Sequence, residues 1–202
     1  LFLLQVNRFH TIYLQRVLSL LKGHRFVSDG IEYQLIDNDG HLTVCRNDSY
    51  RGAVSIPATL NYKNNVLTIS QLDDWAFAMS PSLVSIHLPR TISVIPEKAF
   101  YGCALLEQVT FEEGSQLTEI RDDAFKSSKA LKLFDMPASI KTIQNGAFTD
   151  CSALEQIYLP EGLTSLGGMY GVFDVCSSLK EIVLPNSLTH LSDFCFSGCS
   201  SV

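Results

Sequence analysis

The sequence predicts a repeat solenoid of the α/β or mostly β class, in which short coils stack into a curved array with a parallel sheet, preceded by a small β lead-in. Three observations support this prediction. A motif recurs at a nearly fixed period, each copy contains a strand-like segment, and the residues before the first copy resemble β-hairpins. With 46% apolar residues among 202, the chain can fill a continuous core and is not expected to be disordered.

Two markers define the period. The first is a small residue followed by phenylalanine, at Ala76-Phe77, Ala99-Phe100, Ala124-Phe125, Ala147-Phe148, Val172-Phe173 and Cys195-Phe196. The second is the apolar residue that opens each strand-like segment, at Leu83, Leu106, Leu131, Leu154, Leu179 and Val202. Both markers advance by 23, 25, 23, 25 and 23 residues, so they belong to one unit. The additional residues of the longer units fall within 112–116 and 167–171, and both segments contain glycine, as loop insertions do.

Each unit has three parts. A strand such as Leu154–Leu159 comes first, and Pro160 ends it because proline has no N–H for a sheet ladder. A short apolar step with a spacing of three follows, as in Ile92 and Ile95. The third part is predicted to be a helical or 3₁₀ turn that carries the phenylalanine into the coil interior. One unit alone leaves its apolar faces uncovered, so the units must stack.

Before the repeats, the segments 31–36 and 42–46 flank Asp37-Asn38-Asp39-Gly40, which is typical of a hairpin turn. The same four residues also resemble the start of a calcium loop, but Asp48 stands where such a loop needs glutamate, and the hairpin interpretation is favoured. We therefore divide the chain into an N-terminal segment (1–25), a β-rich lead-in or cap (26–69) and repeats (70–202). The last repeat is incomplete, so the chain is expected to be part of a longer one.

The pattern Leu-x-x-Ile-x-Leu-Pro-x-x-Ile-x-x-Ile-x-x-x-Ala-Phe-x-x-Cys resembles the BspA-type leucine-rich repeats, and the resemblance covers roughly residues 26–202. It implies a secreted or cell-surface location, an adhesion or protein-interaction function, and a protein or glycan as partner. A fold does not fix a function, so these remain expectations. A surface spacer or scaffold that projects another domain, which could be an enzyme, is the alternative.

Residues 1–25 have helical spacing of apolar residues but do not form a signal peptide, because the runs are short and the first alanine is Ala53. A helix packed on the solenoid end, or a translated segment with no fixed structure, is favoured over a helix lying on a membrane surface. No apolar run is long enough for a membrane span. The formal charge of −6 argues against nucleic acid as a partner.

Catalysis, a cofactor and a metal site are not expected. No phosphate loop, dinucleotide fingerprint or nucleophile elbow occurs, and the five histidines are scattered. Of the six cysteines, four occupy one repeat position, at Cys103, Cys151, Cys176 and Cys199. Two other repeats have serine there, which favours buried packing thiols over a disulfide or a metal site.

Alternation along the strands predicts which side chains face the core and which face solvent. The inward residues are predicted to be Leu83, Ile86, Leu88, Leu106, Val109, Phe111, Leu131, Phe134, Met136, Leu154, Ile157, Leu159, Leu179, Ile182 and Leu184. The outward row is the candidate partner-binding surface, and it comprises Ser85, His87, Gln108, Thr110, Leu133, Asp135, Gln156, Tyr158, Glu181 and Val183. Tyr158, flanked by Leu133 and Val183, has the composition of a modest hot spot.

Two further features lie at the ends of the array. Trp75, the single tryptophan, is expected to seal the joint between lead-in and solenoid or to anchor a partner. The last coil has an uncovered apolar edge, so this chain is expected to associate.

Overall fold

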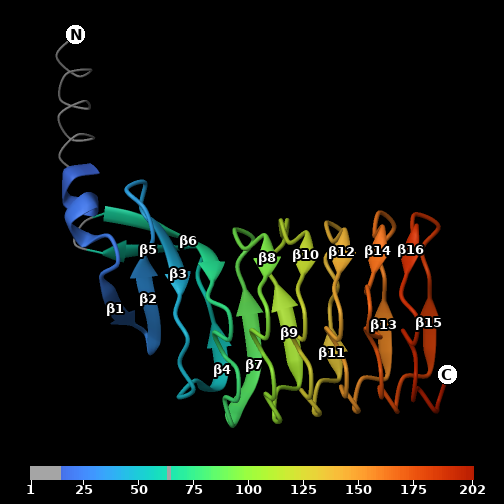
Figure 1. The fold of residues 1–202 in the computed structure, drawn as a ribbon. Coiled ribbons are helices and arrows are strands. Elements are labelled where there is room, and N and C mark those ends of the chain that lie inside the picture. Colours follow the sequence, from blue (N-terminus) through green and yellow to red (C-terminus); the bar gives the residue numbers. More distant parts are fainter. Residues whose placement is uncertain (1–14, 63–64) are drawn as a thin grey trace.

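The computed structural model describes residues 15–62 and 65–202, which form a β-solenoid whose coils stand side by side in a row (Figure 1). The strands of this part of the chain are β1 (Arg25–Ser28), β2 (Ile31–Leu35), β3 (His41–Val44), β4 (Arg51–Ser55), β5 (Thr59–Tyr62), β6 (Asn65–Leu72), β7 (Ser82–Leu88), β8 (Val94–Ile95), β9 (Gln108–Phe111), β10 (Glu119–Ile120), β11 (Leu133–Phe134), β12 (Thr142–Ile143), β13 (Gln156–Tyr158), β14 (Ser165–Leu166), β15 (Glu181–Val183) and β16 (His190–Leu191). The mostly β form of the predicted solenoid is therefore confirmed.

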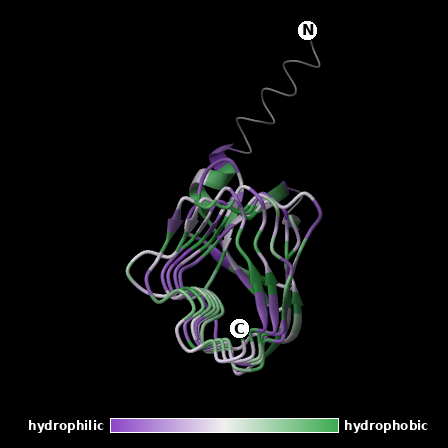
Figure 2. Ribbon diagram, turned by 90° about the vertical axis from the view of Figure 1, so that its right-hand side faces the viewer, coloured by the Kyte–Doolittle hydropathy of each residue, from purple (hydrophilic) through white to green (hydrophobic). Residues whose placement is uncertain are grey.

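Parallel ladders lie on two sides of the solenoid. The long strands, together with two-residue β11, form one side in the order β4-β7-β9-β11, and the separate pair β13-β15 lies beyond β11. The short strands form the other side in the order β8-β10-β12-β14-β16. The prediction of a parallel sheet on one side was incomplete, because the short apolar step of each repeat is itself a strand. Ile120, for example, pairs with Ile95 in one neighbouring coil and Ile143 in the other. Figure 2 looks along the stack and shows the successive coils overlying one another.

The turn that carries each phenylalanine is not helical, so the prediction of a helical or 3₁₀ turn was wrong. Alternate N–H groups of the turn form hydrogen bonds to the next coil. Phe100 donates to the Ala124 carbonyl at 2.8 Å, and Gly102 donates to the Lys126 carbonyl at 2.8 Å. Between them, the Tyr101 N–H closes a local bond to Lys98. Lys98 and Gly102 have left-handed backbone, with φ of 55° and 67°, and this conformation interrupts helical winding. The turns thus form a third line of backbone hydrogen bonds between coils.

The core is a column of stacked phenylalanine rings surrounded by aliphatic side chains. Consecutive rings from Phe77 to Phe196 lie 5.0–5.8 Å apart and are nearly parallel. Most predicted inward residues are buried, while Phe111, Met136 and Ile182 are partly buried. Leu184 is a correction, because 41% of it is exposed. It belongs to the last coil, where no further coil covers its outer side.

The cysteine position is a hydrogen-bonding position as well as a packing position. The Sγ atoms of Cys103, Cys151, Cys176 and Cys199 donate to the carbonyl of the phenylalanine in the preceding coil at 3.0–3.2 Å. Ser128 makes the same bond at 2.8 Å. All six cysteines are free thiols, of which Cys199 is the least buried. Cysteine and serine can replace each other at these five positions because both are small hydrogen-bond donors.

The lead-in covers the N-terminal end of the stack. The predicted hairpin is confirmed, because β2 and β3 pair antiparallel around the turn at residues 37–40, where a carboxylate oxygen of Asp37 accepts the N–H groups of Asp39 and His41. β4 pairs parallel with β7 and so forms the first strand of the long solenoid sheet. β6 continues to Leu72, past the expected boundary at residue 69.

Residues 15–21 are helical and pack on the lead-in through buried Leu18, and Leu21 lies against the same apolar cluster. The helix expected within 1–25 is therefore present in its described part. The remainder of that prediction, including the membrane alternative, concerns residues 1–14 and lies outside the described residues.

Candidate binding surface

The structure places the predicted outward row on the solvent side of the long strands. Leu133, Tyr158 and Val183 are the most exposed apolar members, at 61%, 75% and 63%. Gln108, Asp135, Gln156 and Glu181 are exposed beside them, and Ser85, His87 and Thr110 are half-buried. The row is therefore accessible mainly at its C-terminal half.

The N-terminal half of the row is internally satisfied. β7 and β9 pair in register, so that His87 lies opposite Thr110, and the Nδ1 atom of His87 lies 3.0 Å from the Thr110 hydroxyl. This contact occupies polar groups that a partner would otherwise use. Ser85 lies opposite Gln108 in the same ladder and adds only small polar surface.

The C-terminal half has a different construction because the long sheet is interrupted there. β11 is only two residues long and is not hydrogen-bonded to β13, while Tyr158 pairs in register with Val183. Phe134 is the aromatic member of an inward position otherwise held by isoleucine or valine, and its ring lies edge-on to Phe125 and Phe148. The interruption of the sheet therefore lies where this inward position holds a bulky ring.

A row of alternating charges borders the exposed cluster. Glu107 faces Lys132 at 3.5 Å, and Glu155 faces Lys180 at 2.6 Å. The hydrogen bond from Lys180 lowers the pKa of Glu155. Exposed pairs of this kind contribute little to stability, so they are better placed to orient a charged partner than to hold the fold.

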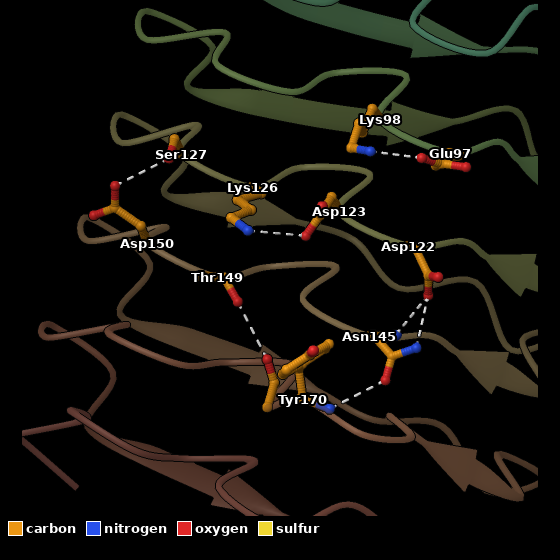
Figure 3. Close-up of polar contacts among 11 residues, drawn as sticks. Glu97, Lys98, Asp122, Asp123, Lys126, Ser127, Asn145, Thr149, Asp150 and Tyr170 are labelled. Carbon is orange, nitrogen blue, oxygen red and sulfur yellow. Dashed lines mark hydrogen bonds and ion pairs between the residues drawn. The ribbon is translucent and has the colours of Figure 1, made fainter.

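A groove along the turns was missed by reasoning from the strands. It has a volume of about 520 Å³ and is lined by residues that flank the small-residue–phenylalanine pairs. Figure 3 shows one part of it, where Asn145 lies between Asp122 and the backbone of Tyr170. The only sequence signal for it was the glycine-bearing insertion at residues 167–171, which forms one wall.

Trp75 lies at the joint between the two parts of the chain. Its half-buried ring lies 5.7 Å from Tyr101, 5.7 Å from the guanidinium of Arg46 in the lead-in and 5.0 Å from the ammonium of Lys98. These contacts connect the lead-in to the first coils, as the sealing interpretation expects.

Within residues 15–62 and 65–202, no group of three or more histidine, cysteine or acidic side chains is arranged to hold a metal ion. The same residues include no helix long and apolar enough to cross a membrane.

The stacked coils with parallel strands, a phenylalanine column and a 23–25-residue period define a leucine-rich-repeat solenoid. The family model for the BspA type leucine rich repeat region matches residues 70–202 in six copies, and the chain belongs to this family. None of the curated proteins compared with the chain matches it.

Several solved structures are similar to the chain. A leucine-rich repeat protein from Bacteroides ovatus is 29% identical with a TM-score of 0.76, over 88% of this chain and 45% of that one. A leucine rich cell surface protein from Faecalibacterium prausnitzii is 22% identical with a TM-score of 0.71, over 88% and 53%. The pneumococcal vaccine antigen PcpA is 23% identical with a TM-score of 0.71, over 88% and 48%. The chain thus spans about half the length of these proteins.

Proposed function

We propose that the chain is a non-catalytic binding module of a secreted or cell-surface protein, and that the outward face of its long strands holds a protein or glycan partner. The observation that carries this proposal is the cluster of Leu133, Tyr158 and Val183, which are exposed on consecutive coils. The surface location is supported by the family, and one solved relative is described as a cell surface protein and another as a vaccine antigen.

The physical case rests on rigidity and composition. A tyrosine on a hydrogen-bonded strand is fixed before binding, so less conformational entropy is lost when a partner covers it. Tyrosine is enriched among residues that dominate interfaces, and a polar rim usually surrounds them. Here Gln156 and Glu181 border Tyr158 and Val183 around a shallow depression. The row of paired charges beside it would fix the orientation of a partner.

A second candidate function is that of a spacer or scaffold that projects another domain, which could be an enzyme. The self-satisfied N-terminal half of the row favours it, because His87 and Thr110 bond to each other and present little free surface.

Substitution of Tyr158 by alanine tests the binding proposal. Purified host extracellular-matrix proteins and glycans are arrayed, and the unchanged chain is measured against each by biolayer interferometry. For a partner found in this way, Tyr158→Ala should weaken binding by about 1–3 kcal/mol while thermal unfolding stays nearly unchanged.

Ser85→Ala is the matched control, because it lies in the same outward row but outside the apolar cluster, and it should leave affinity unchanged. The sheet face is the wrong surface if a partner binds Tyr158→Ala as well as the unchanged chain. Absence of any partner across the array would favour the spacer function.

A further inference from the structure

The middle of the groove along the turns has a floor of bare backbone at two glycines. The position before each small residue is Lys98 and Asp123 in two coils, but Gly146 and Gly171 in the next two. A Cβ atom at Gly146 would lie 2.5 Å from the Oδ1 atom of Asp123, and one at Gly171 would overlap the Phe194 carbonyl oxygen. The two glycines therefore keep the middle of the groove open.

One wall of the groove is a loop whose backbone is hydrogen-bonded to the neighbouring coil. The Oδ1 atom of Asn145 accepts the N–H groups of Met169 at 2.7 Å and Tyr170 at 3.2 Å. Asn145 is itself fixed, because its backbone and side-chain N–H groups donate to Asp122 at 2.9 and 3.0 Å. These contacts anchor the loop backbone, and Figure 3 shows those of Asn145 with Asp122 and Tyr170.

The anchored loop nevertheless presents apolar side chains to solvent. Tyr170 is 70% exposed, and Phe194, from the next coil, is 76% exposed and lines the same groove. The Thr149 hydroxyl donates to the Gly171 carbonyl at 3.2 Å, which fixes the backbone next to Tyr170. Rigid, exposed aromatic rings bind with little loss of conformational entropy.

The charges of the groove favour a cation. Its ionisable lining residues are Glu97, Asp122, Asp123, Asp174, Lys98 and Lys126, so carboxylates exceed ammonium groups. The two lysines are already paired, Lys98 with Glu97 at 2.6 Å and Lys126 with Asp123 at 3.2 Å. The carboxylate of Asp174 has no hydrogen-bond or ion-pair partner within the described part of the chain. It stands in the groove with Tyr170 and Phe194, and aromatic faces also attract cations.

The shape of the groove favours an extended chain as ligand. The lining residues come from five successive coils, and the phenylalanine rings of these coils are 5.0–5.8 Å apart. The groove is thus roughly 20 Å long, which corresponds to about six residues of extended peptide. We propose that it binds an extended peptide segment of another protein and holds a lysine or arginine side chain of that segment at Asp174, beside Tyr170 and Phe194.

Fluorescence anisotropy with a defined probe tests this proposal on the whole chain. The probe is a fluorescein-labelled hexapeptide of alternating glycine and lysine, and its matched control has acetyl-lysine at the same positions, which removes the charge and keeps the stem. The lysine peptide should bind and the acetylated peptide should not. Asp174→Asn and Tyr170→Ala should each weaken binding about three- to tenfold.

Glu113→Gln is the control variant, since it removes an exposed carboxylate that lies outside both the groove and the outward row. It should bind the probe as the unchanged chain does, and circular dichroism confirms that every variant is folded. The proposal is overturned if Glu113→Gln weakens binding as much as Asp174→Asn, because attraction is then only general charge. Equal binding of the acetylated peptide, or binding of maltohexaose without binding of the lysine peptide, would also overturn it.

Discussion

The interior coils and the last coil have equivalent residues in different surroundings. Leu159 is buried, whereas Leu184 at the same repeat position is 41% exposed. On the side of the short strands, Leu166 is fully buried and Leu191 is 44% exposed. The sequence of the repeat is therefore not what buries these residues. The neighbouring coil does so.

The comparison shows where the stability of a repeat array comes from. A coil contributes apolar area and hydrogen-bond partners to its neighbours, so a position gains its full stabilisation only with a coil on both sides. At the N-terminal end the lead-in takes the place of such a neighbour, and the Asn47 N–H donates to the Ala76 carbonyl at 3.0 Å. The exposed leucines of the last coil support the expectation that the chain associates, which stays a prediction.

The largest difference between an interior and a terminal position is expected in the phenylalanine column. Phe125 is fully buried between Phe100 and Phe148, whereas Phe196 is partly buried and, among the described residues, stacks on Phe173 alone. Phe125→Ala should lower the free energy of unfolding by about 3–5 kcal/mol, and Phe196→Ala by less than half of that. Urea denaturation measures both.

If Phe125→Ala does not fold, Phe125→Leu and Phe196→Leu replace the alanine variants. The loss in the free energy of unfolding should again be larger at Phe125, and both losses should be smaller than with alanine. Equal losses at the two positions would contradict the view that the neighbouring coils stabilise the column.

An intermediate difference is expected in the pH dependence of the thiol column. Burial raises the pKa of Cys176 to about 12. Burial also raises the pKa of Cys199, which is less deeply buried. An unfolded thiol releases its proton near pH 9 and the folded Cys176 thiol does not. The stabilisation linked to this thiol is therefore fully present below pH 9. It is lost as the pH rises from 9 towards 12, by about 1.4 kcal/mol per pH unit.

Cys176→Ser should remove that part of the slope, and Cys199→Ser should remove less. Serine is a matched replacement because Ser128 makes the same hydrogen bond in the same column. Urea denaturation at pH 8, 9 and 10 measures the slopes. If both variants keep the slope of the unchanged chain, the column does not control the alkaline stability.

The sequence was sufficient for the period, the inward residues and the lead-in hairpin, because each depends on local spacing. It was insufficient for the turns, where alternate N–H groups such as that of Phe100 bond to the next coil. A left-handed residue such as Lys98 is not visible from composition, and a small-residue–phenylalanine pair is equally compatible with a helix.

The outward row of the candidate site could be listed from strand alternation, but its division into two halves could not. The His87–Thr110 contact depends on register across coils, and the interruption of the sheet beside β11 depends on how the coils pack on one another. The groove along the turns is hidden for the same reason. Gly146, Asp174 and Phe194 come together only when the coils are stacked in register.

The smallest expected difference separates two buried serines at one repeat position. The Ser128 hydroxyl donates to the Phe100 carbonyl at 2.8 Å, whereas the Ser80 hydroxyl is buried without a partner. Ser80 belongs to the first coil, so no preceding phenylalanine offers a carbonyl to it.

Ser128→Ala should lower the free energy of unfolding by about 1 kcal/mol, because the hydrogen bond is lost while the Phe100 carbonyl still accepts the N–H of Cys103. Ser80→Ala should be neutral or slightly stabilising, because it removes a buried hydroxyl that makes no bond. Thermal and urea unfolding of the two variants compare them directly, and a loss at Ser80 as large as that at Ser128 would show that the small side chain is needed there for packing alone.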